Sequence, residues 1–597
     1  MSNVQIPNLP VAISISGSEQ LEAVQEGTSV RITTSQIANL AGGQSSSSTN
    51  FVANIAALRI LTVTVGVNVI VGGYYADGDG GGGFFYGVKG AAPGTYVENY
   101  GTIIVPTGGD GSSAWLRVPA ESMTLAQFGA KGDGTTDDHA AIQAALNAAG
   151  NNMTVYLQGT SGSIFYSASS FTVAIGVTLA GLGWLNESGY NTVTRIGPAL
   201  APFESTILLG SGATIICDQL SAVRDLHVLP YGMTFPQSNS IGWTGTAINA
   251  GTNVTLERLQ IVGFNQAVYI NRVARVFCSR VLFDCNNGIY VYGSGDPTYL
   301  EYCEGWPFAA QGYTSPVTTP AEQLALIGRS GTAFAYDTQN DAGQSQYCFS
   351  FGYTVGHRVT NLTGMRFVGC GADGVQDAAS GYTGLIVEGT SNDIVFTNCA
   401  FVSQAVNVNI SLQPLQNVFF MGGTLGSSAS DTVKISGGGI FATNVYFQGG
   451  LASAVNVSNT NAKATFDSCI FNNYTTALLN NSGNSPYINL NSTNDISSGI
   501  SCPIYSGTQV FYDLTAQSTV NLPIQGNYFR ISGATAITAF TGGWPGRTVT
   551  FGFLGGNTVA SSATLRLNST FSTTSSDTLT LICDGVIWYE VTRSVNV

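Results

Sequence analysis

The chain has 597 residues, of which 9% are charged and 74 are glycine, and its formal net charge is 20 − 34 = −14. So few charges together with 44% hydrophobic residues exclude a disordered chain and indicate a protein rich in β-strands and turns. The acidic balance argues against nucleic acid as the main partner, because phosphate binding requires basic patches.

The N-terminal sequence MSNVQIPNLPVAIS has neither the basic segment nor the apolar core of a signal peptide. No apolar run approaches the roughly 18 residues that span a membrane. The ten cysteines form no C-x-x-C pair, and three of them lie inside apolar strand patterns: Cys278, Cys399 and Cys469. We therefore expect small buried thiols, synthesis in a reducing cytoplasm, release by lysis and no membrane insertion.

Residues 1–50 alternate apolar and polar residues and end in GGQSSSST, which predicts a small β module followed by a linker. Residues 51–120 predict a second β domain, with a strand signal at Ile60–Val71 and a glycine turn at Gly78–Gly83. That turn matches G-x-G-x-x-G. We reject a dinucleotide site there, because the following residues return to a strand pattern and no helix begins.

The stretch Leu125–Gly150 predicts a short strand at Leu125–Phe128, a turn, and one helix over residues 136–149. Thr135 and Asp138 fit a helix-capping pattern, and Gly150 stands where a C-cap would. The residues expected on the apolar helix face are Ile142, Ala145, Leu146 and Ala149. We expect this helix to cap the open end of a parallel β-helix, and we interpret Asp133, Asp137 and Asp138 as turn and cap residues.

Residues 121–500 repeat with a period of about 23, as β-solenoid turns do. An apolar anchor residue recurs in each repeat, 22 to 24 positions after the last. Two runs show this spacing: Ile261 and Phe283, then Phe401, Leu425, Phe447 and Phe471. Val228 and Phe367 also fit, with longer gaps. Asn398, Asn444 and Ser468 precede their anchors by three residues and predict a polar turn position. The leucine-rich repeat alternative fails, because its L-x-x-L-x-L pattern does not recur.

The repeat breaks between Phe283 and Phe367, where three or four turns would fit. Residues 293–346 are poorly periodic and rich in Pro, Tyr, Gly and acids, which predicts an irregular and functional insertion. Residues 501–597 change character again. They end in LTLICDGVIWYE, a hairpin with Asp584-Gly585 at its tip, and predict an antiparallel β domain for trimerisation or glycan binding.

The segment QFGAKGDGTTDDHAAIQAAL resembles the entry motif of pectin-lyase-like right-handed β-helices, particularly those of bacteriophage tailspikes. The segments GVNVIVGGYYADGDGGGGFFYG and GTIIVPTGGDGSSAWLRV are similar to the β domain that precedes that helix in phage tail proteins. GWPGRTVTFGF and DTLTLICDGVIWYEVTRS look like the terminal β module of such spikes. The expected fold class is therefore all-β: N-terminal β adaptor modules, a right-handed parallel β-helix with one capping helix, and a C-terminal antiparallel domain.

The resemblance implies a homotrimer in the virion tail, made in the host cytoplasm. Its N-terminus would attach to phage tail or portal-adaptor proteins, and its β-helix would bind host capsule or lipopolysaccharide. Family spikes often cleave such polysaccharides, by a pair of carboxylates in hydrolases or by a base and a uronate-neutralising group in lyases. We expect a hydrolase rather than a lyase, with no cofactor and no metal.

The candidate residues gather in and just after the irregular segment, where acids and aromatic rings alternate. Individual acids there are also the ordinary carboxylates of a solvated loop, and the rings can simply pack the insertion. The preferred carboxylates are Glu301, Glu304, Asp337 and Asp341, and the preferred substrate-binding residues are Tyr299, Tyr302, Trp306 and Arg329.

Two other functions stay open at this point. The first is a spike or fibre that only binds its receptor or only supports structure. The second is a non-viral secreted polysaccharide lyase, which the missing signal peptide and the N-terminal β modules disfavour. A serine elbow of the G-x-S-x-G type and an H-E-x-x-H zinc motif are both absent from the sequence.

Overall fold

The computed structural model divides the chain into two units, residues 1–120 with 126–129 and residues 121–125 with 130–597. The described residues are 20–25, 28–33, 50–183, 205–237 and 242–596, less short gaps at 311, 316–317, 339–342, 375–381, 403–405, 427–429, 450–451, 460, 481–486, 491–494, 497–498, 502–504, 507–510 and 523–526. The predicted GGQSSSST linker lies outside these ranges, as do residues 1–19 of the predicted β module. Among the described residues, no helix has both the length and the apolar character needed to cross a bilayer.

The first unit contains a hairpin of β1 (Gln20–Gln25) and β2 (Thr28–Thr33) and a five-stranded sheet in the order β3-β4-β5-β7-β6. The sheet strands are β3 (Asn50–Asn54), β4 (Asn68–Gly73), β5 (Gly83–Lys89), β6 (Ile103–Ile104) and β7 (Ser113–Arg117). The strand predicted over Ile60–Val71 is wrong in its first half. Helix α2 (Ile55–Ile60) ends at the first residue of that stretch, and residues 61–67 form a bend and a turn before β4 begins. The Asn54 side chain caps α2 at Ala57 N, and Ile55 and Leu58 enter the core.

The entry to the β-helix differs from the prediction in three details. Residues Leu125–Phe128 form a 3-10 helix, η2, rather than a strand, and Asp133–Asp137 form strand β9. Helix α3 therefore begins only at His139 and ends at Ala148. Its predicted buried face is confirmed for Ile142, Ala145 and Leu146, whereas Ala149 is the extended C-cap.

The Asp-rich turn before α3 is structural, as predicted. The Asp138 carboxylate makes no helix cap and instead accepts hydrogen bonds from the backbone N–H groups of Lys131 and Gly132. Asp133 accepts bonds from the backbone and hydroxyl groups of Thr135 and Thr136, and these bonds hold its pKa well below its usual range.

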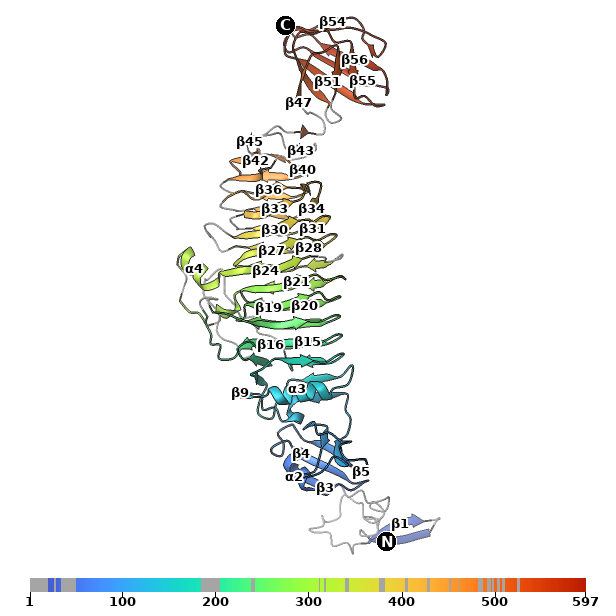
Figure 1. Ribbon diagram of the computed structural model, residues 1–597, viewed down its shortest axis with the longest axis vertical. Helices are drawn as coiled ribbons and strands as arrows, with labels where there is room; N and C mark the ends of the chain where they lie inside the picture. Colours follow the sequence, from blue (N-terminus) through green and yellow to red (C-terminus); the bar gives the residue numbers. More distant parts are fainter. Residues whose placement is uncertain are drawn as a thin grey trace, which may run out of the picture. The chain divides into compact units, whose positions relative to one another are not determined.

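The parallel β-helix predicted from the period is confirmed, and its strands stack as successive turns, called rungs below (Figure 1). One side is a 13-stranded parallel sheet: β12 (Phe171–Val173), β15 (Ile215–Cys217), β17 (Thr246–Ala250), β19 (Gln266–Asn271), β21 (Asn287–Tyr292), β24 (Arg329–Asp337), β27 (Tyr353–Thr360), β30 (Thr383–Gly389), β33 (Val406–Leu412), β36 (Val433–Gly437), β39 (Ser453–Val457), β42 (Thr476–Asn480) and β45 (Gly499–Ser501).

The second sheet is 26-stranded and turns a corner within each rung. Its first strands are β8 (Ser122–Thr124), β9, β10 (Thr154–Tyr156), β11 (Ile164–Ser167), β13 (Thr178–Ala180), β14 (Thr206–Leu209), β16 (Ala222–Pro230), β18 (Thr255–Val262) and β20 (Phe277–Asp284). Seven later rungs carry two strands each: β22 (Tyr299–Glu301) and β23 (Glu304–Gly305), β25 (Gln344–Gln346) and β26 (Phe349–Phe351), β28 (Arg366–Val368) and β29 (Gly371–Asp373), β31 (Ile394–Thr397) and β32 (Ala400–Val402), β34 (Asn417–Met421) and β35 (Thr424–Gly426), β37 (Gly439–Thr443) and β38 (Tyr446–Gln448), and β40 (Lys463–Asp467) and β41 (Ile470–Asn472). The sheet ends with β43 (Tyr487–Leu490), β44 (Asp495–Ile496) and β46 (Tyr505–Ser506), of which β46 stacks on β43.

The corner of this sheet is made by a residue in the left-handed region, and the predicted polar turn position is confirmed there. Asn398, Asn444 and Ser468 have φ of 51°, 57° and 53°. Asparagine tolerates this conformation better than most residues. In four successive rungs the residue after the corner is a buried free cysteine: Cys303, Cys348, Cys370 and Cys399. The nine described cysteines are all free and buried, as predicted, and Cys502 lies outside the described residues.

The predicted anchors form one row of paired residues down the stack, running from Val228 through Ile261 and Phe283 to Phe401 and Phe471. The prediction that Phe367 is an anchor is wrong. It pairs with Phe396 in the neighbouring row, and Ala372 takes the anchor position of its rung. Two rungs, rather than the predicted three or four, lie between those of Phe283 and Ala372. Gly305 and Ser350 occupy the anchor position in these two rungs.

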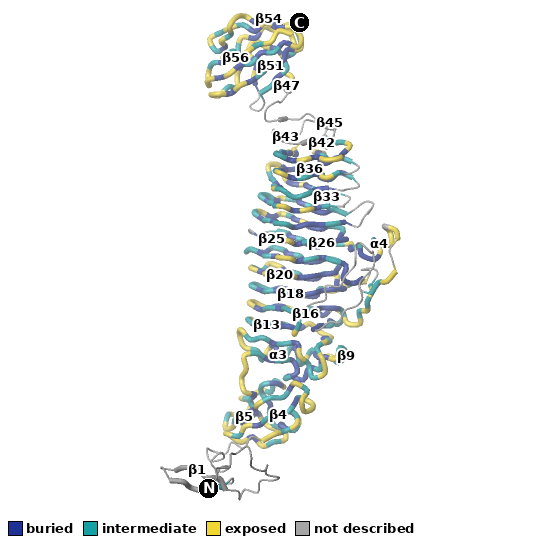
Figure 2. The backbone as a smooth tube through the Cα atoms, turned by 180° about the vertical axis from the view of Figure 1, so that it is seen from behind, coloured by how far each residue is buried: buried dark blue, intermediate teal, exposed yellow. Residues whose placement is uncertain are grey.

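The irregular insertion is therefore shorter than predicted. It runs between β23 and β24 and holds η3 (Phe308–Ala310) and α4 (Pro320–Ile327), which begins with a capping box at Thr319 and Glu322. Its apolar residues pack on the outer face of the 26-stranded sheet, against residues such as Val262, Leu282 and Phe351. In Figure 2 the rungs are largely buried, whereas the chain around α4 is largely exposed.

The C-terminal domain is mixed rather than antiparallel. Its main sheet has the order β47-β49-β51-β55-β56-β53, in which β47, β49 and β51 pair in parallel and β51, β55 and β56 pair antiparallel. The predicted hairpin is confirmed as β55 and β56. The strands are β47 (Phe511–Thr515), β48 (Thr519–Asn521), β49 (Tyr528–Ser532), β50 (Ala539–Thr541), β51 (Thr548–Phe553), β52 (Thr558–Val559), β53 (Leu565–Arg566), β54 (Phe571–Ser572), β55 (Thr578–Cys583) and β56 (Trp588–Ser594).

Candidate functional site

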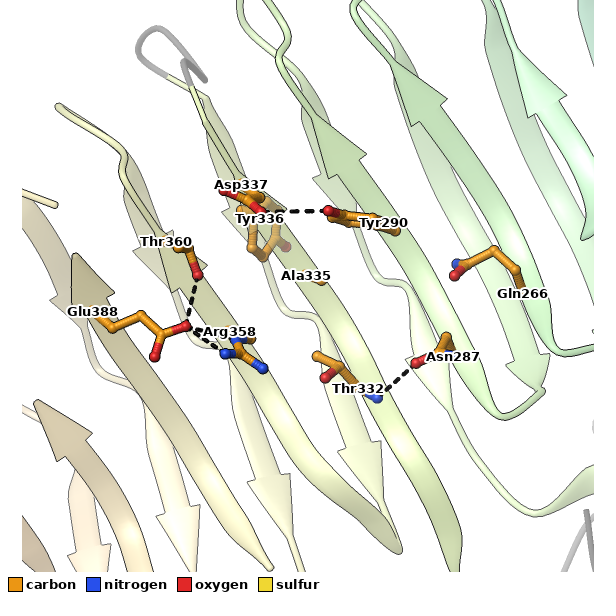
Figure 3. Close-up of a pocket in the computed structure, with 10 residues that line it drawn as sticks. All are labelled: Gln266, Asn287, Tyr290, Thr332, Ala335, Tyr336, Asp337, Arg358, Thr360 and Glu388. Carbon is orange, nitrogen blue, oxygen red and sulfur yellow. Dashed lines mark hydrogen bonds and ion pairs between the residues drawn. The ribbon is translucent and has the colours of Figure 1, made fainter. Parts of the chain in front are cut away.

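A hollow of about 270 Å³ lies on the outer face of the 13-stranded sheet, over strands β19 to β30 (Figure 3). Its lining is polar and aromatic, and two carboxylates and one guanidinium reach it. The residues are Gln266, Asn287, Tyr290, Thr332, Ala335, Tyr336, Asp337, Arg358, Thr360 and Glu388. Concave sites with a few convergent polar groups are the usual form of binding sites.

The hollow exists because one outward side chain is small. Tyr290, Ala335 and Arg358 are paired across β21, β24 and β27, so they occupy the same position on three successive rungs. Side chains alternate between the two faces of a strand, so Phe334 and Tyr336, which flank Ala335, are buried in the core. The Ala335 methyl therefore leaves a space between the tyrosine ring and the guanidinium, as Figure 3 shows.

Asp337, Thr360 and Glu388 form a second outward row across the same rungs, called the acidic row below. Strands in a sheet are spaced by about 4.8 Å, so the backbones of Asp337 and Glu388, two rungs apart, are separated by roughly 10 Å. Thr360 lies between them and is too small to fill the space above it. The acidic row thus presents two carboxylates to one opening.

Each carboxylate is held by different partners. Glu388 Oε1 accepts hydrogen bonds from Arg358 Nε at 2.8 Å and Thr360 Oγ1 at 3.1 Å, and Arg358 Nη2 lies 2.6 Å away. Asp337 accepts bonds from Thr338 Oγ1 at 2.7 Å and from the Tyr290 hydroxyl at 3.4 Å. Burial, and then the nearby Asp337 charge, raises the pKa of Tyr290, so the phenol keeps its proton and acts as the donor.

Three tyrosines adjoin the hollow on its N-terminal side. The ring centroids of Tyr269 and Tyr290 are 5.6 Å apart, and those of Tyr290 and Tyr292 are 6.2 Å apart. The Arg272 guanidinium lies 5.7 Å from the Tyr292 ring. All three rings are half-buried, so they form a fixed aromatic surface that continues into the acidic row.

Asp337 is the one residue of the sequence-predicted set that lines the hollow. Glu301, Glu304, Tyr299 and Tyr302 lie on β22, on β23 or at the corner between them, in the other sheet. There Tyr299 stacks on Phe277 at 5.1 Å and Tyr302 on Tyr347 at 5.1 Å. Trp306 is half-buried beneath the insertion, next to Phe349 and Phe351. Asp341 lies outside the described residues.

The prediction that Arg329 binds substrate is corrected by its burial. Its side chain is 1% exposed and forms an ion pair with the equally buried Asp284. It also donates to the carbonyl groups of Leu326 and Gly328. Arg329 therefore holds the base of the insertion and has no open surface at which to meet a ligand.

Glu388, Arg358 and Tyr290 were missed by the sequence analysis. The strand GTAFAYD ends in Asp337 and the strand TGLIVEG has Glu388 next to its end, and aligning the two at these acids would have placed them in one row. Within the described residues, no group of three or more His, Cys, Asp or Glu side chains is arranged to hold a metal ion.

Comparison with known proteins gives one family match. Residues 51–120 match the family described as the phage tail protein small four-stranded beta-sheet domain. This match confirms the predicted relationship of this segment to phage tail proteins. No curated protein matches the sequence.

Solved structures with a similar backbone include three β-helix proteins. The enzymatically active domain of tailspike protein 2 from bacteriophage CBA120 is 15% identical with a TM-score of 0.38, over 80% of this chain and 59% of that one. A tailspike of Acinetobacter baumannii bacteriophage Fri1, described as a capsular polysaccharide depolymerase, is 12% identical with a TM-score of 0.37, over 75% and 71%. The mannuronan C-5 epimerase A-module of Azotobacter vinelandii is 16% identical with a TM-score of 0.33, over 64% and 97%. The chain thus spans less than two thirds of the CBA120 protein.

Proposed function

We propose that the chain is a bacteriophage tail spike whose β-helix binds a polysaccharide of the host surface and hydrolyses it in the hollow of the 13-stranded sheet. The observation that carries the proposal is the acidic row, with Asp337 and Glu388 two rungs apart beside a tyrosine surface. The phage tail domain at residues 51–120 supports the setting in a virion tail.

The spacing of the carboxylates favours hydrolysis with inversion. Inverting glycosidases keep their two carboxyl groups about 6.5–9.5 Å apart, so that a water molecule fits between the base and the sugar. Side chains on backbones roughly 10 Å apart can reach this range by leaning toward each other. Retention requires a separation of about 5 Å, which neighbouring rungs would supply and rungs two apart do not.

Glu388 is assigned the role of general base. Arg358 and Thr360 donate hydrogen bonds that hold its carboxylate in place, and this carboxylate takes a proton from water. The hydroxide that results attacks the anomeric carbon. The acid role requires Asp337, on the other side of the sugar, in its protonated form: that proton passes to the leaving glycosidic oxygen as the bond between this oxygen and the anomeric carbon breaks.

Lyase chemistry is disfavoured by the same contacts. A lyase needs a cation to neutralise a uronate, but Arg358 is already paired with Glu388. We therefore favour hydrolase activity over lyase activity.

The quaternary part of the proposal is a homotrimer, attached to phage tail or portal-adaptor proteins through its N-terminal domains. Exposed apolar side chains on the outer face of the 26-stranded sheet support it, among them Phe277, Met421 and Phe441. In a trimer such side chains would be covered by another chain. Three copies would carry 3 × −14 = −42 charges, which favours solubility.

The test is an assay of new chain ends. The purified full-length chain is incubated with capsular polysaccharide and with lipopolysaccharide from a strain to which it binds, and reducing ends are counted over time. Hydrolysis gives a steady rise in saturated reducing ends. Binding without any rise leaves a spike that only attaches, and unsaturated uronates would identify a lyase.

A further inference from the structure

A second aromatic surface lies in the C-terminal domain, where the turn at residues 544–546 meets the hairpin tip at residues 584–586. Trp544 is 45% exposed, and it is the only exposed tryptophan in the described part of the chain. The two turns are in contact, because Gly546 N donates to Cys583 O at 2.8 Å and a Cβ on Gly585 would lie 3.1 Å from Pro545. One surface is thus built from two segments far apart in the sequence.

The Trp544 ring is fixed by Arg547. The guanidinium carbon of Arg547 lies 4.3 Å from the ring centroid, and this arginine is 4% exposed. Its Nη1 also donates to Gly542 O, so the cation is anchored to the backbone beneath the ring. A ring held in this way loses little conformational freedom when a ligand binds.

The exposed part of the Trp544 ring is about the size of one sugar ring. A tryptophan side chain offers up to about 250 Å², so the open part of Trp544 is roughly 110 Å². Val586 beside it is 74% exposed but has a smaller side chain. A stable protein partner needs about 800 Å² on each side. The Trp544 ring on its own thus matches one sugar ring, and the molar mass of the variant tests the alternative of a second copy of the chain.

The charge exposed at this surface is that of Asp584. The Asp584 carboxylate accepts bonds from the backbone N–H groups of Val586 and Ile587 at 2.9 and 2.8 Å and from the Tyr589 hydroxyl at 3.1 Å. The charge of Arg547 is buried under the ring. An anionic partner is disfavoured, because the exposed Asp584 carboxylate carries a negative charge at the hairpin tip.

We propose that Trp544 is the stacking platform of a second, non-catalytic carbohydrate site that binds a neutral pyranose of a polysaccharide. The C–H groups on one face of the sugar pack on the indole ring. The site lies in a different domain from the hollow of the 13-stranded sheet and does not depend on hydrolysis. A second contact on the same polymer raises the overall affinity by effective concentration.

The test measures binding alone. The full-length wild type, Trp544→Ala and Trp544→Phe are run through native gels that contain capsular polysaccharide or lipopolysaccharide from a strain that the wild type binds. Leu554→Ala is the matched control, since Leu554 is 48% exposed in the same domain. We expect retention at least tenfold weaker for Trp544→Ala, partly restored for Trp544→Phe, and unchanged for Leu554→Ala.

Three results would overturn the proposal. The first is wild-type retention of Trp544→Ala, and the second is a failure of the wild type to be retained by either polysaccharide. The third is a change in molar mass of Trp544→Ala in light scattering, which would make the surface a subunit interface. Hydrolysis at Asp337 and Glu388 is scored separately by reducing ends, so either proposal can fail while the other holds.

Discussion

Arg329 and Asp284 form a bidentate ion pair that is closed to solvent, with Nε to Oδ1 at 2.5 Å and Nη2 to Oδ2 at 2.8 Å. Asp284 Oδ2 also accepts the backbone N–H of Ala309 at 2.7 Å. The pair therefore joins the last residue of β20 to the first residue of β24 and to the start of the insertion. It fastens the insertion to the β-helix on both sides.

Replacing one partner of this pair leaves a buried charge without its counter-charge. We expect Arg329→Met to destabilise the protein by about 3–5 kcal/mol. Unfolding rates in urea and limited proteolysis within residues 306–328 would measure the loss. Arg366→Met is the matched control, because the Arg366–Asp393 pair is exposed and should contribute less than about 1 kcal/mol. Equal behaviour of the two variants would refute the fastening role.

Acid should destabilise the fold through His227. Burial lowers the pKa of His227 to about 4, whereas an unfolded histidine titrates near 6.5. Between these values the unfolded chain binds more protons than the folded one, so stability falls as pH drops from about 6.5 to 4 and is intact above 6.5. The loss is about 3 kcal/mol.

The measurement is urea unfolding at pH 7.5, 5.5 and 4.5 for the wild type and His227→Gln. The carboxylates titrate in both proteins, so the difference between the two slopes isolates the histidine. We expect the wild type to lose more stability than the variant over this range. Parallel slopes would show that His227 does not resist protonation in the fold.

Filling the hollow should block the polysaccharide without unfolding the rung. Ala335→Leu places a larger side chain between Tyr290 and Arg358 on the outer face, where the change should alter stability by less than about 0.5 kcal/mol. Polysaccharide affinity should fall at least tenfold in a binding titration. Asn409→Leu lies in the same outward row beyond the hollow and should bind as the wild type does. Undiminished binding by Ala335→Leu would move the site elsewhere.

The stereochemistry of the product tests the geometry of the acidic row. With carboxylates two rungs apart, the new anomeric centre should form with inverted configuration, visible in proton NMR spectra recorded before mutarotation. A product of retained configuration would require a second carboxylate one rung from the first, and Thr360 occupies that position.

Much of the fold could be predicted from the sequence, because large anchors such as Phe401, Phe447 and Phe471 repeat at one row of the β-helix. The period disappears at Gly305, where small residues enter the row. A Cβ on Gly305 would lie 2.8 Å from Phe283 and 2.9 Å from Tyr353, so large side chains from other strands fill that part of the core. Tertiary packing of this kind leaves no periodic mark in the sequence.

The site was predicted only in part, for a related reason. Acids that are neighbours in the sequence, such as Glu301 and Glu304, point outward from the other sheet, whereas Asp337 and Glu388 are 51 positions apart and share a row. Acids that are close in the sequence were therefore predicted to form one site, but the structure places Glu301 and Glu304 in a different sheet from Asp337. Arg329 was misassigned because nothing in its local sequence shows that Asp284 neutralises it.

The measurement that tests the central claim most directly is the release of reducing ends by Asp337→Asn and Glu388→Gln, with Glu301→Gln and Glu304→Gln as controls. Loss of either member of a catalytic carboxylate pair costs at least about 100-fold in turnover. We predict that Asp337→Asn and Glu388→Gln lose hydrolysis to this extent while still binding the polysaccharide, and that both controls hydrolyse as the wild type does. Wild-type turnover by Asp337→Asn and Glu388→Gln would contradict the assignment of the hollow as the hydrolytic site.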